Sequence, residues 1–333
     1  MKVEVIEKSL LGRELVFVVE KEKVDTEKKK IVDEIKKDAV VEGFRKGKVP
    51  ESIIEAKFAD TIKENLLNRI IPELYYETIK EKNLNVVVEP SIYEVNLDQE
   101  GLKFKIYTEI KPEVVLKKYK GIPVKKRIPE VVTEEEIEKV LDEWEKKPEF
   151  SAAIIDPSKR RAWKDKIRGQ MEGYNKYKAS VQEEQELWEG VMKDVELQVP
   201  DKLIQERAAR YTEDHFRSLD LKDKTEEERK KIVEEVFEKM KPVAELDIKK
   251  YFILDKISEL EKIEVTPKDV DERIEKISRS IGEPVTTYKE KLEKAGRIPD
   301  IEDEIRIEKT FNFLKENSQS IEKIILPEDA KGR

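Results

Sequence analysis

The chain has 333 residues, of which 43% are charged and 38% are hydrophobic. This length predicts two or three domains, and the low apolar fraction favours an elongated molecule with several thin cores. The 68 basic and 76 acidic residues leave a net charge of only −8, and apolar residues recur at regular spacing, so we reject general disorder. The acidic balance also argues against a general nucleic-acid coat, although a local basic spot is compatible with it.

The residue types that are absent exclude several kinds of site. There is no cysteine, so disulfides, thiol nucleophiles and cysteine-based metal sites are excluded. His215 is the only histidine, which rules out a two-histidine zinc site, and we expect it to be solvated on a helix surface. No glycine-rich loop ending in Gly-Lys and a hydroxyl residue is present to hold ATP. We therefore predict no catalytic residues, no metal and no cofactor.

The first ten residues, MKVEVIEKSL, carry charge from the second position and lack an apolar core, unlike a secretory signal. No stretch approaches the ~20 apolar residues of a membrane-spanning helix. We predict a cytoplasmic protein without membrane contact.

Residues 1–112 show the pattern of an α+β domain, in the order strand, strand, helix, helix, strand, strand. Alternating apolar residues predict two strands around 3–5 and 15–19. A hairpin is predicted over 86–109, with its turn at 99–101.

Two helices are predicted between these pairs of strands. Residues 25–26 predict the N-cap of the first helix, which continues to about Val40. The second helix covers 51–82, with a break near Asp60 and a kink at Pro72.

The remainder of the chain predicts a linker followed by a mainly α-helical domain. Residues 113–157 read as an extended linker, because prolines and Gly121 are spread through it, with a short helix that starts at Thr133. Residues 158–326 are helical by period almost throughout, and 327–333 form a tail. No repeat of 20 to 50 residues indicates a solenoid.

An unusual loop, GFRKGKVP, joins the two N-terminal helices. Its glycines permit positive φ and hence a tight turn, and its proline suits the start of the next helix. Between the glycines lie one phenyl ring and two cations, a third cation follows directly, and no acid occurs from Gly43 to Pro50. Arginine can bind phosphate or carboxylate with two parallel hydrogen bonds, lysine adds a point charge, and the ring can fill a pocket or stack on a base. The candidate binding residues are Gly43, Phe44, Arg45, Lys46, Gly47, Lys48 and Pro50.

The residues of this loop leave a second interpretation open. In it, the loop only connects two helices, Phe44 packs back into the domain's own core, and the lysines are merely solvated. Without further information, the sequence predicts an α+β module with a basic tip, joined to a helical module.

The segment GFRKGKVP is similar to the ribosome-binding signature of the trigger factor family. Other segments resemble that family as well: KPEV at 111–114, VTEEEI at 132–137, VELQVP at 195–200 and FNFL at 311–314. The resemblance covers nearly the whole chain, strongly to about residue 150 and moderately from residue 158.

The resemblance implies an ATP-independent chaperone with an α+β ribosome-binding domain and a helical domain that offers a concave, patchily apolar surface to clients. It implies that Phe44, Arg45 and Lys46 contact a ribosomal protein and large-subunit rRNA at the tunnel exit. The implied partners are the large ribosomal subunit and unfolded or nascent polypeptides. Whether the free protein forms a homodimer is left open.

The chain departs from the family pattern after the linker helix. Family members usually carry an FKBP-like prolyl-isomerase domain there, which needs ~100 residues, and the segment 149–157 is far too short for one. We therefore expect a protein without isomerase activity, and no enzyme. The rival interpretations are a ribosome-free holdase or assembly chaperone, a peptidyl-prolyl isomerase, and a helical scaffold without clients.

Aromatic residues in the helical region are assigned to packing. Apolar helix faces usually pack against a core, and this interpretation is preferred over a client-binding surface for Met171, Tyr174 and Tyr177. The tryptophans given the same assignment are Trp144, Trp163 and Trp188.

Overall fold

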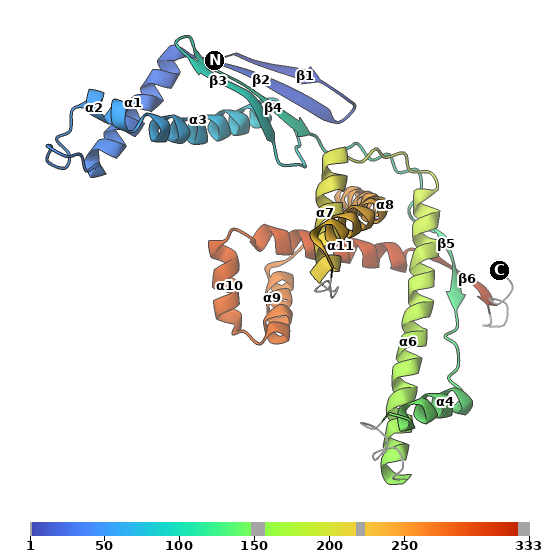
Figure 1. The fold of residues 1–333 in the computed structure, drawn as a ribbon. Coiled ribbons are helices and arrows are strands. Elements are labelled where there is room, and N and C mark those ends of the chain that lie inside the picture. The colour runs from blue at the N-terminus through green and yellow to red at the C-terminus, as the bar shows by residue number, and fades with distance from the viewer. Residues whose placement is uncertain (1, 148–156, 218–223, 326–333) are drawn as a thin grey trace. The chain divides into compact units, whose positions relative to one another are not determined.

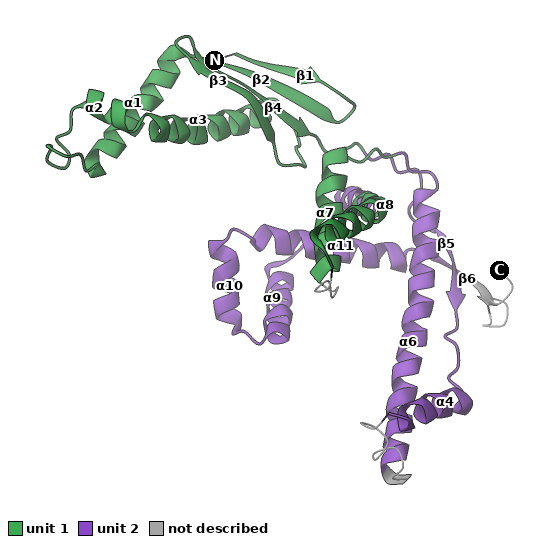
Figure 2. Cartoon of the chain, viewed as in Figure 1, with its two compact units in different colours: residues 1–113, 197–249 green, residues 114–196, 250–333 purple. Residues whose placement is uncertain are grey.

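The computed structural model describes residues 2–147, 157–217 and 224–325, which are mainly helical with a small sheet near the N-terminus (Figure 1). The chain forms two compact units (Figure 2). Unit 1 contains residues 1–113 and 197–249, and unit 2 contains residues 114–196 and 250–333. This division groups part of the helical region with the N-terminal residues, and the domain limits at 113, 158 and 327 stay predictions from the sequence.

A four-stranded antiparallel sheet is the base of unit 1, in the order β1-β2-β4-β3. It confirms the two strands and the hairpin predicted for this region. The strands are β1 (Lys2–Glu7), β2 (Gly12–Glu20), β3 (Ser91–Asp98) and β4 (Gly101–Glu109).

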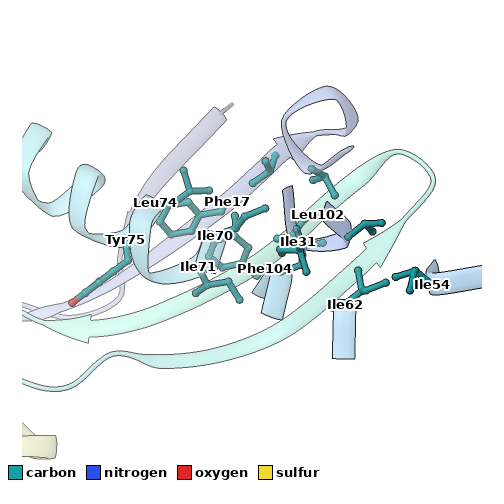
Figure 3. Close-up of a cluster of buried hydrophobic side chains, with 14 of the residues drawn as sticks. Phe17, Ile31, Ile54, Ile62, Ile70, Ile71, Leu74, Tyr75, Leu102 and Phe104 are labelled. Carbon is teal, nitrogen blue, oxygen red and sulfur yellow. The ribbon is translucent and has the colours of Figure 1, made fainter. Parts of the chain in front are cut away.

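The core of unit 1 lies between this sheet and the helices that follow β2 (Figure 3). Every second residue of β2, from Leu15 to Val19, faces the core, because side chains alternate between the two faces of a strand. Phe17 lies opposite Phe104 of β4, and their rings stack with centroids 4.5 Å apart. Both rings are fully buried and should contribute strongly to the stability of this unit.

The helices of unit 1 follow the predicted order with two shifts in their limits. They are α1 (Lys21–Asp38), α2 (Glu51–Lys57), α3 (Ala59–Glu81), α7 (Asp201–Arg217) and the first part of α8 (Glu226–Glu261). The predicted N-cap at 25–26 is wrong, because α1 begins directly after β2 and already buries Val24 in the core. The predicted break near Asp60 lies at Phe58, and Pro72 is accommodated inside α3.

Unit 2 is built mainly from helices. They are α4 (Glu134–Glu145), α6 (Pro157–Met192), the last part of α8, α9 (Pro267–Ile281), α10 (Val285–Lys294) and α11 (Ile298–Glu316). Thr133 caps α4 as predicted, and Glu136 completes a capping box with it. No helix in the described part of the chain is long and apolar enough to cross a membrane.

Two short strands in unit 2 correct the sequence prediction. The linker contains β5 (Pro123–Arg127), and the predicted helical region ends at Glu316 and continues as β6 (Gln319–Ile325), which pairs with β5 in parallel. The backbone amides of Lys125 and Arg127 donate to carboxylates of α6. These contacts depend on residues far apart in the chain, which local periodicity does not detect.

The tryptophans of unit 2 pack as predicted. Trp144 of α4 meets Trp163 of α6 edge to face at 5.6 Å, and Trp188 stacks on Phe311 of α11 at 5.6 Å.

The buried aromatic pair of unit 1 gives a direct test of this core. Phe104→Ala should cost roughly 3–5 kcal/mol, because it removes a buried ring and leaves a cavity, so hydrogen exchange of β2 and β4 amides should accelerate at least about 100-fold. Phe44→Ala deletes the same ring from an exposed loop and should leave this exchange unchanged. Equal exchange in the two variants would contradict the described core.

Candidate functional site

The segment 39–50 connects α1 to α2 (Figure 1), and its two ends are anchored in the core of unit 1. Val41 and Val49 are buried and belong to the same core cluster as the sheet residues. The residues between them are exposed, apart from a partly buried Gly47. Burial of the two valines therefore fixes where the loop leaves and re-enters the domain, and the residues between them form an exposed tip.

Two consecutive turns shape this tip. The amide of Phe44 donates to the carbonyl of Val41 at 3.0 Å, and the amide of Lys48 donates to the carbonyl of Arg45 at 2.9 Å. Gly43 and Gly47 occupy the third position of each turn with φ of 84° and 78°, as a type II turn requires. The four-residue spacing of the glycines thus places one turn directly after the other.

The side chain of Phe44 lies outside the core. It is 41% exposed and takes no part in the hydrophobic cluster to which Val41 and Val49 belong. The interpretation in which this ring packs back into the domain is therefore wrong. A phenyl ring at a tip that also carries three cations gives the loop one apolar contact surface for a partner.

The three cations of the tip differ in their surroundings. Arg45 and Lys48 are exposed, and within the described residues neither forms an ion pair. Lys46 lies 2.9 Å from the Oδ1 atom of Asp38, the last residue of α1. This hydrogen bond and the positive charge of Lys46 hold the pKa of the Asp38 carboxyl below its usual range. The tip therefore presents two unpaired cations and one that already has an internal counter-ion.

The structure brings all seven predicted site residues together on this one connection. Pro50 serves as the N-cap of α2, and its carbonyl accepts the amides of Ile53 and Ile54 at 3.1 Å. Three contributors were not identified from the sequence: the anchors Val41 and Val49, and the counter-ion Asp38. The two valines are apolar residues that flank the glycine-containing tip on either side, which is the signal that could have identified them.

A second exposed apolar surface lies on α6. Tyr174 and Tyr177 are 65% and 67% exposed, and Val181 is exposed as well. The prediction that these tyrosines pack against a local core is wrong. Met171 does pack against the small core that α4 and α6 share around Ile167.

The spacing along α6 explains this difference. Residues 167, 171, 174 and 181 share one face of a helix, and α4 covers that face only at the N-terminal end. The side-chain amide of Asn175 donates to the carbonyl of Glu130 at 2.9 Å, so the segment before α4 contacts α6 beside the tyrosines. We call the residues Tyr174, Tyr177 and Val181 the tyrosine stripe.

The described residues form no candidate metal centre. No group of three or more histidine, aspartate or glutamate residues there could hold a metal ion. His215 is exposed on α7.

Two family models match this chain. The model described as bacterial trigger factor protein matches residues 1–144, which include the whole loop, and the model described as its C-terminus matches residues 162–316.

Curated relatives agree with these models. The chain is 34% identical over 127 residues to the trigger factor of Geotalea uraniireducens (strain Rf4) and 34% identical over 156 residues to that of Koribacter versatilis (strain Ellin345). These alignments cover 38% and 46% of the chain but only 29% and 35% of the relatives. The alignment with the trigger factor of Solibacter usitatus (strain Ellin6076) is 25% identical over 398 residues and covers 89% of the chain and 94% of the relative.

A solved structure, "Promiscuous Substrate Recognition in Folding and Assembly Activities of the Trigger Factor Chaperone", has a similar fold. The likeness has a TM-score of 0.54 at 14% sequence identity, and it covers 95% of this chain and 99% of that chain. This likeness concerns the fold, and the two family models, which together match most of the sequence, show that the chain belongs to the trigger factor family.

Proposed function

We propose that this protein is an ATP-independent chaperone of the cytoplasm that docks on the large ribosomal subunit through the tip of residues 43–50 and shields nascent chains. The observation that carries the proposal is the exposed ring of Phe44, followed in the sequence by three cations, on a loop whose ends are anchored in the core. A ribosomal surface presents phosphate groups and protein carboxylates together with apolar pockets. The cations of the tip can bind the phosphates and carboxylates, and the ring of Phe44 can fill an apolar pocket.

Docking makes weak client contacts sufficient. A chaperone held beside the point where a chain emerges meets that chain at a high effective concentration, so each apolar contact can be weak and reversible. The client then leaves as folding buries its own apolar residues, and no nucleotide is needed for release.

The tyrosine stripe is our candidate for a client-contacting surface. Tyrosine offers a large, rigid contact area that is apolar on its faces and polar at its hydroxyl. Such a surface binds unfolded segments without selecting one sequence. The tyrosines of the stripe are exposed, and no residue that the structure describes covers them.

The first test is cosedimentation with ribosomes. Changing Phe44, Arg45 and Lys46 together to alanine should abolish retention of the protein by large ribosomal subunits at low salt, because it removes the ring and two of the three cations of the tip. The control is the wild-type chain, which should be retained at low salt and released as salt rises. Unchanged retention of the triple variant would mean that another surface makes the contact.

The second test separates the client surface from the tip. Changing Tyr174, Tyr177 and Val181 to serine should weaken suppression of aggregation of an unfolded model protein in the absence of ribosomes. The alanine variant of the tip should suppress aggregation as well as the wild type does. Full suppression by the serine variant would exclude the stripe as a client surface, and no suppression by the wild type would favour a scaffold without clients.

We further propose that the chain lacks the FKBP-like isomerase domain. The two matching models leave only residues 145–161 between them. The 398 aligned positions of the Solibacter relative exceed the matched part of this chain by about 100, which is the size of a small domain.

Contacts between α4 and α6 support the same proposal. Arg160 of α6 reaches Glu138, Asp142 and Glu145 of α4 at 2.7, 3.4 and 3.2 Å. Together with the pair of Trp144 and Trp163, these contacts hold the two helices beside each other. The two helices that would flank an inserted domain thus pack directly against each other.

A proline-limited refolding assay tests this absence. At concentrations far below that of the substrate, the protein should leave the slow, proline-limited phase unchanged, whereas an FKBP-type isomerase accelerates it in the same assay. A rate that rises in proportion to the concentration of this protein would contradict the proposal and assign it isomerase activity.

A further inference from the structure

Asp38 occupies an unfavourable position for the stability of α1. It is the last residue of that helix, where the unpaired carbonyl groups make the end partially negative and disfavour an acid. Lys36 and Lys37, in the same turn, have the charge that this end favours. The helix therefore does not explain the presence of an acid at position 38.

The contact of Asp38 with Lys46 is of the weak and easily exchanged kind. The two side chains are 84% and 61% exposed, and their charged atoms lie 2.9 Å apart. Exposed pairs of this type stabilise a fold very little, because water screens them and both side chains lose freedom. An anion presented by a partner can therefore displace Asp38 from Lys46 at low cost.

We propose that Asp38 is an internal counter-ion that competes with the ribosomal anion for Lys46 and so weakens docking of the tip. The inference rests on the proposed function of the loop. In the free protein, Lys46 is neutralised by a residue of its own domain. On docking, Lys46 must leave Asp38 in order to bind the ribosomal anion. Lys46 therefore adds less affinity than an unpaired cation would. A device of this kind favours rapid release from the ribosome.

Asp38→Asn tests the proposal because it removes the charge and keeps the size of the side chain. The affinity for isolated large subunits should rise about 1.5- to 5-fold, the factor expected when an exposed ion pair no longer opposes binding. The dependence of the logarithm of the binding constant on the logarithm of the salt concentration should steepen, by up to about 0.9 if Lys46 gains one phosphate contact.

Two controls separate this effect from other causes. Asp33→Asn removes the same charge from an exposed position of the same helix, where the side chain has no ion pair within the described residues, and it should leave affinity nearly unchanged. In a Lys46→Gln background, Asp38→Asn should also have no effect, because the cation that it releases is gone. An effect on helix stability or on general charge repulsion would persist in that background.

The outcomes distinguish this inference from the proposed function. If wild-type protein is not retained by large subunits at low salt, the proposed function fails and the inference fails with it. If the wild type is retained and Asp38→Asn matches Asp33→Asn, or acts equally in the Lys46→Gln background, only the role of Asp38 is overturned.

Discussion

The burial of Val41 and Val49 is the constraint on which the rest of the account depends. Each valine anchors one end of a short connection in the core of unit 1, and the chain between them has to turn twice. The two glycines accept the positive φ that these turns need. As a result, Phe44 and the three cations lie on an exposed loop and not on a helix or strand. The buried ends of the loop set their position.

Much of unit 1 could be predicted from the sequence because its signals are local. Alternating apolar residues in β2 and β4 identify strands, and the glycine spacing in GFRKGKVP identifies tight turns. The start of α1 could not be predicted in this way, since burial of Val24 against the core overrides the capping signal further along the chain. The contact between Asp38 and Lys46 also escaped prediction, because turn geometry rather than sequence spacing brings the two side chains together.

Unit 2 shows where periodicity is insufficient. An apolar face predicts that a helix can pack, but it does not say where the covering element ends, and on α6 the cover of α4 ends before Tyr174. The parallel pairing of β5 with β6 joins segments almost 200 residues apart (positions 123–127 and 319–325), and neither strand carries a strong local signal. In the proposed function the exposed tip holds the protein near a client, and the uncovered tyrosines contact that client.

Site-specific photo-crosslinking from position 44 tests the central claim most directly. A photoreactive phenylalanine analogue in place of Phe44 should crosslink to a component of the large ribosomal subunit, whereas the same analogue in place of Tyr76, an exposed ring on α3 of the same unit, should not. Absence of a crosslink from position 44, or equal yields from the two positions, would contradict the account.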